Sequence, residues 1–289
     1  MTARVALAAA LVTLVSLSLV ATVTAGAQQA VFSSKIEAVR VDVLVTDKGQ
    51  PVRGLAPADF EILDNGVMQQ VDLVSFEQVP LNVILALDMS ESVAGERLDH
   101  LRAAGHALLN GLKKDDQAAL VTFRHAVTLG ADLASNASTV RAALDAAEPS
   151  GETALVDGSY AAMVVAESDV GRSLLIAFSD GLDTSSWLQP DAVVETAKRS
   201  DVVAYAVSVG RVKSEFLNDL TSFTGGRLFE IEKTANLSAI FLSILEEFRQ
   251  RYLVSYTPRG VARDGWHRLT VRVKRRGTVK ARPGYLAGS

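Results

Sequence analysis

The sequence predicts an α/β fold with a doubly wound, mostly parallel sheet, preceded and followed along the chain by shorter β segments. Apolar runs alternate with amphipathic helical stretches between residues 81 and 248, which is typical of a parallel α/β sheet. Residues 31–79 and 252–289 instead show the period-two alternation of half-buried strands. The 289 residues are 48% hydrophobic and include no cysteine, so we expect the core to be stable without disulfides.

The first β segment contains three predicted strands. Valines stand at every second position from 39 to 45, and a turn with Gly49 follows. Residues 60–63 form the next predicted strand, and Asp64-Asn65-Gly66 is a strong hairpin signal. The chain then returns in one predicted strand over residues 68–76.

The central segment supplies six strands and six helices. The predicted strands cover residues 82–87, 118–123, 127–129, 173–178, 202–209 and 227–231. The predicted helices cover residues 96–112, 139–147, 155–167, 190–199, 214–223 and 237–251. The strand at 127–129 follows Phe123 too closely for a helical crossover, so we expect it to be an antiparallel edge strand.

The last β segment has predicted strands at 252–256, 269–273 and 279–281. These strands are too few to form a stable sheet alone, and the first segment is also short. We therefore expect both flanks, including strands 39–45 and 269–273, to form one small β-sandwich into which the α/β domain is inserted. The predicted division is 28–79, 80–250 and 251–289.

Residues 1–27 have the pattern of a secretory signal peptide. Arg4 gives a positive start, residues 5–23 carry no charge, and Ala25-Gly26-Ala27 matches a cleavage site. The alternative is an uncleaved membrane anchor, because the apolar run is close to the roughly 20 residues that span a bilayer. We favour cleavage, since polar glutamines follow, and we expect an exported protein without a membrane span.

The run Asp88-Met89-Ser90-Glu91-Ser92 is the strongest candidate for a functional site. It follows the apolar run 81–87, so a carboxylate and two hydroxyls leave the end of a buried strand together. All three side chains offer hard oxygen ligands, which suit Mg²⁺, Mn²⁺ or Ca²⁺ better than zinc or copper.

Two later segments complete the pattern. Thr153 lies in Gly151-Glu152-Thr153-Ala154-Leu155, and Asp180 lies in Ser179-Asp180-Gly181, which ends the apolar run 174–178. D-x-S-x-S, G-x-T-A-L and S-D-G in this order resemble the metal-ion-dependent adhesion site of von Willebrand factor A domains. The resemblance implies a sheet of five parallel strands and one antiparallel edge strand.

A wider resemblance covers nearly the whole chain after residue 27. The segments 45–52, 59–60, 64–66 and 281–285 are similar to exported bacterial proteins grouped as von Willebrand factor A-related domain proteins, which are frequent in acidobacteria. That family has no firmly assigned biochemical role. The resemblance implies a location in the periplasm or outside the cell.

The resemblance also implies a role for each candidate ligand. Ser90 and Ser92 would bind the ion directly, Asp88 and Asp180 through water, and Thr153 in either way. Mg²⁺ requires six oxygens, so one position is left for an Asp or Glu side chain of a partner protein. Taken singly, these residues have simpler explanations: the hydroxyls fit helix caps, and Asp180-Gly181 fits a turn.

Four neighbouring carboxylates have weaker predicted roles. We expect Asp157 to support the site or to start a helix, and Asp183 to tune the site from a loop. Glu91 and Glu152 add negative charge beside the open position, which would weaken the approach of an acidic partner.

The sequence favours a binding module over an enzyme. It lacks the G-x-S-x-G, Walker and H-E-x-x-H motifs, and its four histidines show no ligand spacing. Ser90 with Asp180 resembles a nucleophile and its orienting acid without a base between them, so a hydrolase is the weakest alternative. The other alternative is a scaffold that binds through its β-sandwich, with the metal incidental.

Charge excludes one class of partner and marks one segment. The formal net charge is −4, so we expect no general attraction to nucleic acid. Eight basic residues lie between Arg263 and Arg282, and we interpret them as the solvated face of alternating strands.

Overall fold

The computed structural model describes residues 38–76, 79–167 and 171–288. The predicted signal peptide at 1–27 lies outside these residues. None of the described helices is both long and apolar enough to cross a membrane.

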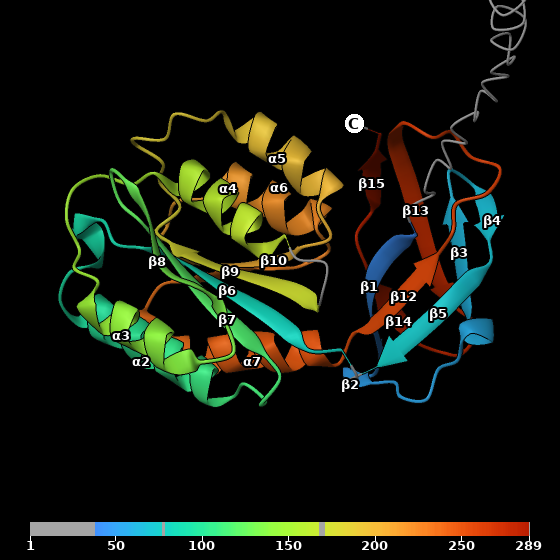
Figure 1. The fold of residues 1–289 in the computed structure, drawn as a ribbon, viewed down its shortest axis with the longest axis horizontal. Coiled ribbons are helices and arrows are strands. Elements are labelled where there is room, and N and C mark those ends of the chain that lie inside the picture. The colour runs from blue at the N-terminus through green and yellow to red at the C-terminus, as the bar shows by residue number, and fades with distance from the viewer. Residues whose placement is uncertain (1–37, 77–78, 168–170, 289) are drawn as a thin grey trace, which may run out of the picture. The chain divides into compact units, whose positions relative to one another are not determined.

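The central sheet has six strands in the order β11-β10-β9-β6-β7-β8 (Figure 1). Every neighbouring pair is parallel except β7 and β8, so the predicted antiparallel edge strand is confirmed. The strands are β6 (Leu81–Asp88), β7 (Gln117–Phe123), β8 (Val127–Ala134), β9 (Arg172–Ser179), β10 (Val203–Val209) and β11 (Leu228–Ile231).

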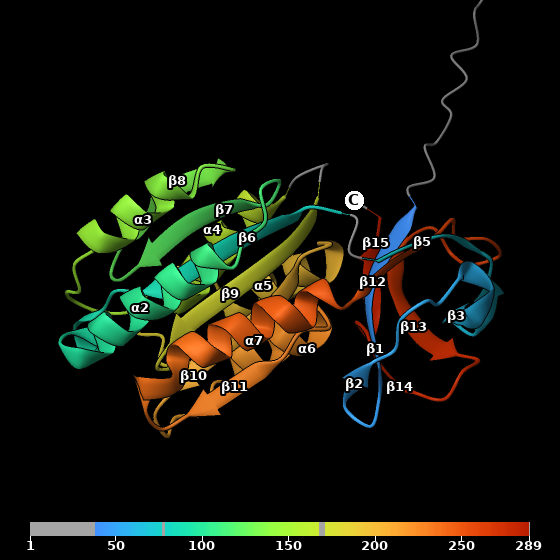
Figure 2. The ribbon, with the colours of Figure 1, turned by 90° about the horizontal axis from the view of Figure 1, so that it is seen from below.

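Helices cover both faces of this sheet, as Figures 1 and 2 show. One face packs against α2 (Glu96–Asn110), α3 (Ala137–Ala146) and α7 (Leu237–Arg249). The other face packs against α4 (Leu155–Ala166), α5 (Pro190–Arg199) and α6 (Glu215–Phe223).

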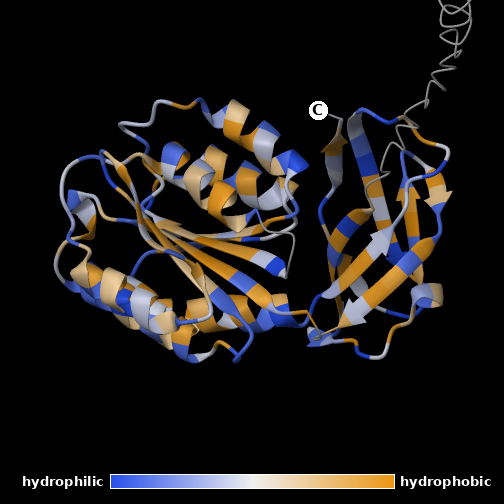
Figure 3. Cartoon of the chain, in the orientation of Figure 1, coloured by the Kyte–Doolittle hydropathy of each residue, from blue (hydrophilic) through white to orange (hydrophobic). Residues whose placement is uncertain are grey.

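Strand β6 is buried on both sides, which explains its unbroken apolar run. Val83, Leu85 and Leu87 lie in the first core, whereas Ile84 and Ala86 lie in the second. Figure 3 shows the same pattern, with hydrophobic central strands between helices whose outer faces are hydrophilic. A strand with two covered faces can place its polar residues only at its ends.

Strands from both ends of the described chain form two further sheets. One has the order β14-β1-β12-β5, with β2 paired to β1, and the other has the order β15-β13-β3-β4. Their strands are β1 (Val39–Asp47), β2 (Gln50–Pro51), β3 (Phe60–Asp64), β4 (Val67–Gln69), β5 (Val71–Phe76), β12 (Tyr252–Tyr256), β13 (Gly265–Val273), β14 (Thr278–Lys280) and β15 (Gly284–Ala287). Short 3₁₀ turns lie at η1 (Pro57–Asp59), η2 (Glu91–Val93) and η3 (Thr234–Asn236).

These two sheets share one hydrophobic core and form the expected β-sandwich. Val41 and Val254 from the first sheet pack in the same cluster as Ile62 and Leu269 from the second. Strand β1 pairs with β12, and β3 pairs with β13, although the members of each pair lie far apart along the chain. The chain divides as a sandwich split by an α/β insertion, and we retain 28–79, 80–250 and 251–289 as the proposed boundaries.

The single strand predicted over residues 68–76 is wrong. The chain changes sheets there, because β4 pairs with β3 while β5 pairs with β12. Buried Gln69 holds this crossing: its Nε2 donates to the Arg259 carbonyl (2.9 Å), and its Oε1 accepts from the Arg259 N–H (2.9 Å). Strand β15 is an addition to the strands predicted from sequence.

The basic segment near the C-terminus divides into two kinds of residue. Arg268 and Arg272 are exposed on alternating positions of β13, as predicted. Arg282 is buried, so its assignment to a solvated face is wrong. Its guanidinium donates to the carbonyl oxygens of Ser200 (2.8 Å) and Lys198 (2.6 Å), which lie at the end of α5. Burial lowers the pKa of Arg282 from its ordinary value.

Candidate metal site

Asp88 ends strand β6 and is fully buried. Its Oδ1 accepts from the Ser90 N–H (2.8 Å), and its Oδ2 accepts from the Ser179 hydroxyl (2.8 Å). Because β6 and β9 are neighbouring parallel strands, their carboxyl ends place Asp88 beside Ser179. Burial raises the pKa of Asp88 above its ordinary value, and the charge of Asp180 raises it further. The hydrogen bonds from Ser90 and Ser179 act in the opposite direction.

Ser90 and Ser92 present their hydroxyls to each other just beyond Asp88. The two Oγ atoms lie 3.2 Å apart; Ser90 is buried and Ser92 is exposed. Neither serine caps helix α2, because its N-cap is Gly95, which receives no side-chain capping bond. The structure therefore does not use these hydroxyls in the simpler role that the sequence also allowed.

Backbone hydrogen bonds join this loop to the segment before α4. The Ser150 N–H donates to the Met89 carbonyl (2.8 Å), and the Glu91 N–H donates to the Gly151 carbonyl (3.0 Å). Two residues further on, Thr153 is buried with 5% of its surface exposed. The first two motifs of the predicted site are thus held side by side.

Thr153 is joined in turn to the loop that follows β9. Its carbonyl accepts from the N–H groups of Thr184 (2.9 Å) and Ser185 (3.1 Å). Thr153 does not cap helix α4. The N–H groups of Leu155 (2.8 Å) and Val156 (3.3 Å) donate instead to Asp183 Oδ1.

Asp180 opens the loop after β9. It is half-buried, and its Oδ1 accepts from the Leu182 N–H (3.1 Å) across a turn at Gly181, where φ is +85°. The simple explanation as a turn therefore holds for Asp180, but its charge also acts on Asp88. The loops that carry all five predicted ligands are connected by hydrogen bonds at the carboxyl edge of the sheet.

Asp157 and Asp183 shape the loop after β9. Asp183 caps α4, and the two oxygens of Asp157 accept from the N–H groups of Trp187 (3.0 Å) and Leu188 (2.9 Å). Their side chains are occupied by protein donors. This agrees with a supporting role for Asp157 and fixes Asp183 as a helix cap.

The five predicted ligand side chains suit a hard divalent cation. Two carboxylates and three hydroxyls offer lone pairs, and a cation beside Asp88 would favour the charged form that burial disfavours. Within the described ranges, no group of three or more His, Cys, Asp or Glu side chains forms a metal-binding cluster.

Three residues near the site were not singled out from sequence. Ser179 holds Asp88, and its position directly before Asp180 at the end of an apolar run was the available signal. Arg124 donates to the Ser150 hydroxyl. His125 is exposed, and its Nδ1 would lie 2.9 Å from a Cβ atom placed on Gly151.

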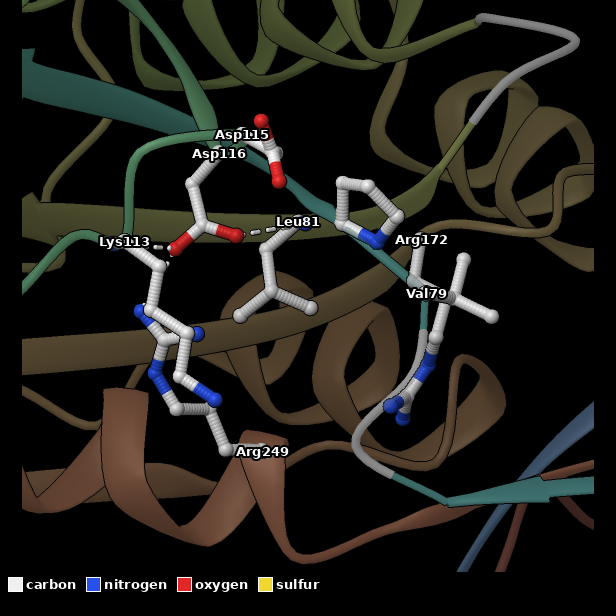
Figure 4. Close-up of a pocket in the computed structure, with 8 residues that line it drawn as sticks. Val79, Leu81, Lys113, Asp115, Asp116, Arg172 and Arg249 are labelled. Carbon is white, nitrogen blue, oxygen red and sulfur yellow. Dashed lines mark hydrogen bonds and ion pairs between the residues drawn. The ribbon is translucent and has the colours of Figure 1, made fainter.

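A polar pocket lies at the other end of β6 from the candidate metal site (Figure 4). Its Asp116, Arg172 and Arg249 side chains are bonded to other groups of the protein. Asp116 accepts from the Leu81 N–H (2.9 Å), from the Lys113 N–H (2.7 Å) and from the Arg249 guanidinium (2.6 Å). Arg172 in the same pocket donates through Nε to Asp42 of strand β1 (2.7 Å). These bonds anchor chain segments, so we assign this pocket a structural role.

The fold defines a doubly wound α/β domain with a polar carboxyl edge, and family comparison agrees. The von Willebrand factor type A domain model matches residues 82–242, more than half of the chain. The chain therefore belongs to the von Willebrand factor type A domain family.

Relatives with curated descriptions share this domain at low identity. Inter-alpha-trypsin inhibitor heavy chain H2 of Sus scrofa is 26% identical over 182 residues, which cover 56% of this chain and 20% of that protein. Calcium-activated chloride channel regulator 4 of Homo sapiens is 28% identical over 163 residues, which cover 53% of this chain and 17% of that protein. This chain spans about a fifth of the length of the curated relatives it matches.

Among solved structures, proximal thread matrix protein 1 from the mussel byssus is similar in fold. The TM-score is 0.55 at 18% identity, covering 64% of this chain and 49% of that chain. That structure has a zinc-occupied metal-ion-dependent adhesion site.

Proposed function

We propose that this protein is an exported, non-catalytic protein-binding module that uses a metal-ion-dependent adhesion site. Asp88, Ser90, Ser92, Thr153 and Asp180 would hold Mg²⁺, or Mn²⁺ or Ca²⁺ in its place. The partner would be a protein that offers an Asp or Glu carboxylate to the open coordination position.

One observation carries this proposal: three separate loops with the matching motifs are hydrogen-bonded to one another around a buried carboxylate. Burial, and to a smaller extent the charge of Asp180, raises the pKa of Asp88, and a bound cation would favour the charged form. The zinc-occupied site of the mussel byssus protein supports a divalent ion in this fold.

The chain's own residues set what the ion can do. Ser90 and Ser92 are neutral, so they leave a bound ion electron-poor, and the ion supplies a strong local positive charge for a partner carboxylate. Asp88, fixed by Ser90 and Ser179, holds the loop in place. No described histidine bonds to either serine, although exposed His125 lies beside Gly151, so we propose binding rather than hydrolysis.

Calorimetric titration of Mg²⁺ and Mn²⁺ tests the metal site. Asp180→Asn is a suitable variant, because the amide oxygen can still accept from the Leu182 N–H while the charge is lost. We expect affinity to fall at least about tenfold in this variant, equivalent to about 1.4 kcal/mol. Asp219→Asn, an exposed change on α6, is the matched control and should bind as the wild type does. Equal heats in all three proteins would refute the site.

A scaffold that binds through the sandwich is the second candidate, favoured by the exposed arginines of β13. An Arg268→Glu/Arg272→Glu variant and a chelator separate the two functions. Partner capture that ignores chelator but is lost in the double variant would favour the scaffold. The hydrolase alternative requires turnover of a model ester that disappears in Ser90→Ala.

Export rests on the sequence of residues 1–27. We propose that the signal peptide is removed after Ala27 and that the protein functions in the periplasm or outside the cell. N-terminal sequencing of the protein recovered from an expressing bacterium should begin at Gln28. A protein that retains Met1 and sediments with membranes would favour the uncleaved anchor.

A further inference from the structure

Exposed apolar side chains gather on two loops at the carboxyl edge of the central sheet. Twelve large apolar side chains are exposed in the described part of the chain, and four of them lie in the loops that follow β9 and β10. These are Leu182, Trp187, Leu188 and Val212. Trp187 is the extreme case, with 90% of its surface exposed. Clustered exposure of this kind marks an interaction surface more often than scattered single residues do.

The two loops lie next to each other and next to the candidate metal site. A Cβ atom placed on Gly181 would lie 3.5 Å from the Val212 carbonyl oxygen, so the loops touch there. Thr184 donates directly to the Thr153 carbonyl (2.9 Å). Trp187 is three residues further on, so its Cα lies at most about 11 Å from that of Thr184.

The backbone beneath Trp187 is fixed although its side chain is exposed. The N–H groups of Trp187 and Leu188 donate to Asp157, which lies in the first turn of α4. The Ser186 hydroxyl accepts from the N–H groups of Val156 and Asp157 (both 3.1 Å) and donates to Asp183 (2.6 Å). An aromatic side chain on a preorganised backbone loses little entropy on binding.

Carboxylates outnumber basic side chains around the metal site. Six carboxylates stand against two charges on a bound divalent ion and two on arginine side chains. These side chains are Asp88, Glu91, Glu152, Asp157, Asp180, Asp183, Arg97 and Arg124. The surroundings of the ion therefore add no attraction for an acidic partner, and a contact outside the ion would add to the affinity.

We propose that Trp187, with Leu182 and Val212, forms a metal-independent apolar anchor for the same partner, which inserts an aromatic or aliphatic side chain there while its carboxylate meets the ion. This inference rests on the proposed function. The partner segment should carry its acidic and apolar residues close together in sequence, because Trp187 is three residues from Thr184, which donates to Thr153. Trp is the residue type most enriched among interface residues that dominate affinity.

A phage-displayed library of short random peptides, selected on the immobilised full chain in Mg²⁺ and eluted with chelator, tests this inference. We expect the wild type to enrich peptides with an Asp or Glu near an apolar side chain. Trp187→Ser should still enrich acidic peptides but without the apolar preference. Leu73→Ser removes another exposed apolar side chain, on β5, and should select as the wild type does.

The outcomes separate the two proposals. Acidic peptides with no apolar preference in the wild type would overturn the anchor and leave the metal-binding function intact. No acidic preference at all would overturn both. An enriched peptide, made synthetically, should bind Trp187→Ser at least about tenfold more weakly. A change of oligomeric state in Trp187→Ser would show that a second copy of this chain covers the loop, which would also overturn the anchor.

Discussion

Asp64 and Asp88 are both fully buried carboxylates, yet their surroundings differ in kind. Asp64, at the end of β3 in the sandwich, accepts from His267 Nδ1 (2.8 Å) and from the hydroxyls of Tyr256 and Tyr285 (both 2.9 Å). Asp88 accepts from one N–H and one hydroxyl and lies beside a second carboxylate and two serine hydroxyls. Both carboxylates accept hydrogen bonds, but the second also lies near the charge of another carboxylate. We call the first the donor-rich cluster and the second, with its serine hydroxyls and Asp180, the acceptor-rich site.

This difference is the one we expect between a structural carboxylate and the carboxylate of the proposed metal site. Burial raises the pKa of Tyr256 and of Tyr285, so both phenols keep their protons and remain donors to Asp64. The protein therefore compensates the charge of Asp64 by itself. For Asp88 the protein supplies further negative charge, and a cation would complete the set.

The largest expected effect is on the donor-rich cluster. Asp64→Ala should lower the free energy of unfolding by about 3–5 kcal/mol, because three donors, of which His267 and Tyr256 are buried, lose their acceptor. Denaturant unfolding measures this, and the loss should be the same with Mg²⁺ and with chelator. Asp72→Ala is the control, since exposed Asp72 accepts from Thr257 in the same sandwich and its loss should change stability little. A loss of stability in Asp64→Ala that depends on Mg²⁺ would contradict the distinction between Asp64 and Asp88.

The acceptor-rich site should respond to metal instead. At about one hundred times its dissociation constant, Mg²⁺ should raise the free energy of unfolding by about 2.7 kcal/mol. Thermal and denaturant unfolding at matched Mg²⁺ concentrations measure the increment. We expect Asp180→Asn to lower the increment to about 1.4 kcal/mol or less, as a tenfold or greater loss of affinity requires, and Asp64→Ala to retain it in full. An undiminished increment in Asp180→Asn would place the ion elsewhere.

A substitution with a smaller expected effect tests one hydrogen bond of the donor-rich cluster. Tyr285→Phe removes one hydrogen bond to Asp64 while Tyr256 still donates to the same oxygen. We expect a loss of about 1.5 kcal/mol, the lower range for a hydrogen bond to a charged group. Tyr160→Phe, on the exposed side of α4, is the control. Equal stability of Tyr285→Phe and the wild type would mean that Asp64 needs fewer donors than the structure shows.

The smallest expected effect concerns the partly buried ammonium group of Lys280. Burial lowers the pKa of Lys280 below its ordinary value of 10.5, against the attraction of Glu247 (3.9 Å). The folded protein therefore disfavours the charged form of Lys280. The contribution of Lys280 to stability is present above pH 10.5 and is lost as pH falls through the lowered pKa. Relative to Lys280→Met, the wild type should gain stability between pH 8 and pH 11, measured by denaturant unfolding. Parallel curves would contradict this.

The sequence predicted the central domain well because its signals are local. The run 81–87 is apolar on both faces, and each motif of the site directly follows a strand or precedes a helix. Parallel strands then bring their carboxyl ends together without further information. The fold class and the placement of the three motifs followed from these features.

The sandwich was predicted less well because its polar contacts join distant parts of the chain. Asp64 looked like part of a hairpin turn, and the hairpin does form, but its three donors lie about 190–220 residues away along the chain. His267 likewise showed no partner within its own segment. The sheet change after Gln69 depends on Arg259, and no local pattern marks it.

A crystal of the full chain soaked in Mn²⁺ tests the central claim most directly, through the anomalous scattering of the ion. We expect one strong anomalous peak beside the hydroxyls of Ser90 and Ser92, close to Asp88, and none at Asp64 and His267. The peak should weaken in crystals of Asp180→Asn soaked at the same Mn²⁺ concentration. A soaked wild-type crystal with no peak at Ser90 and Ser92, or with its peak at Asp64, would contradict the distinction between the two buried carboxylates.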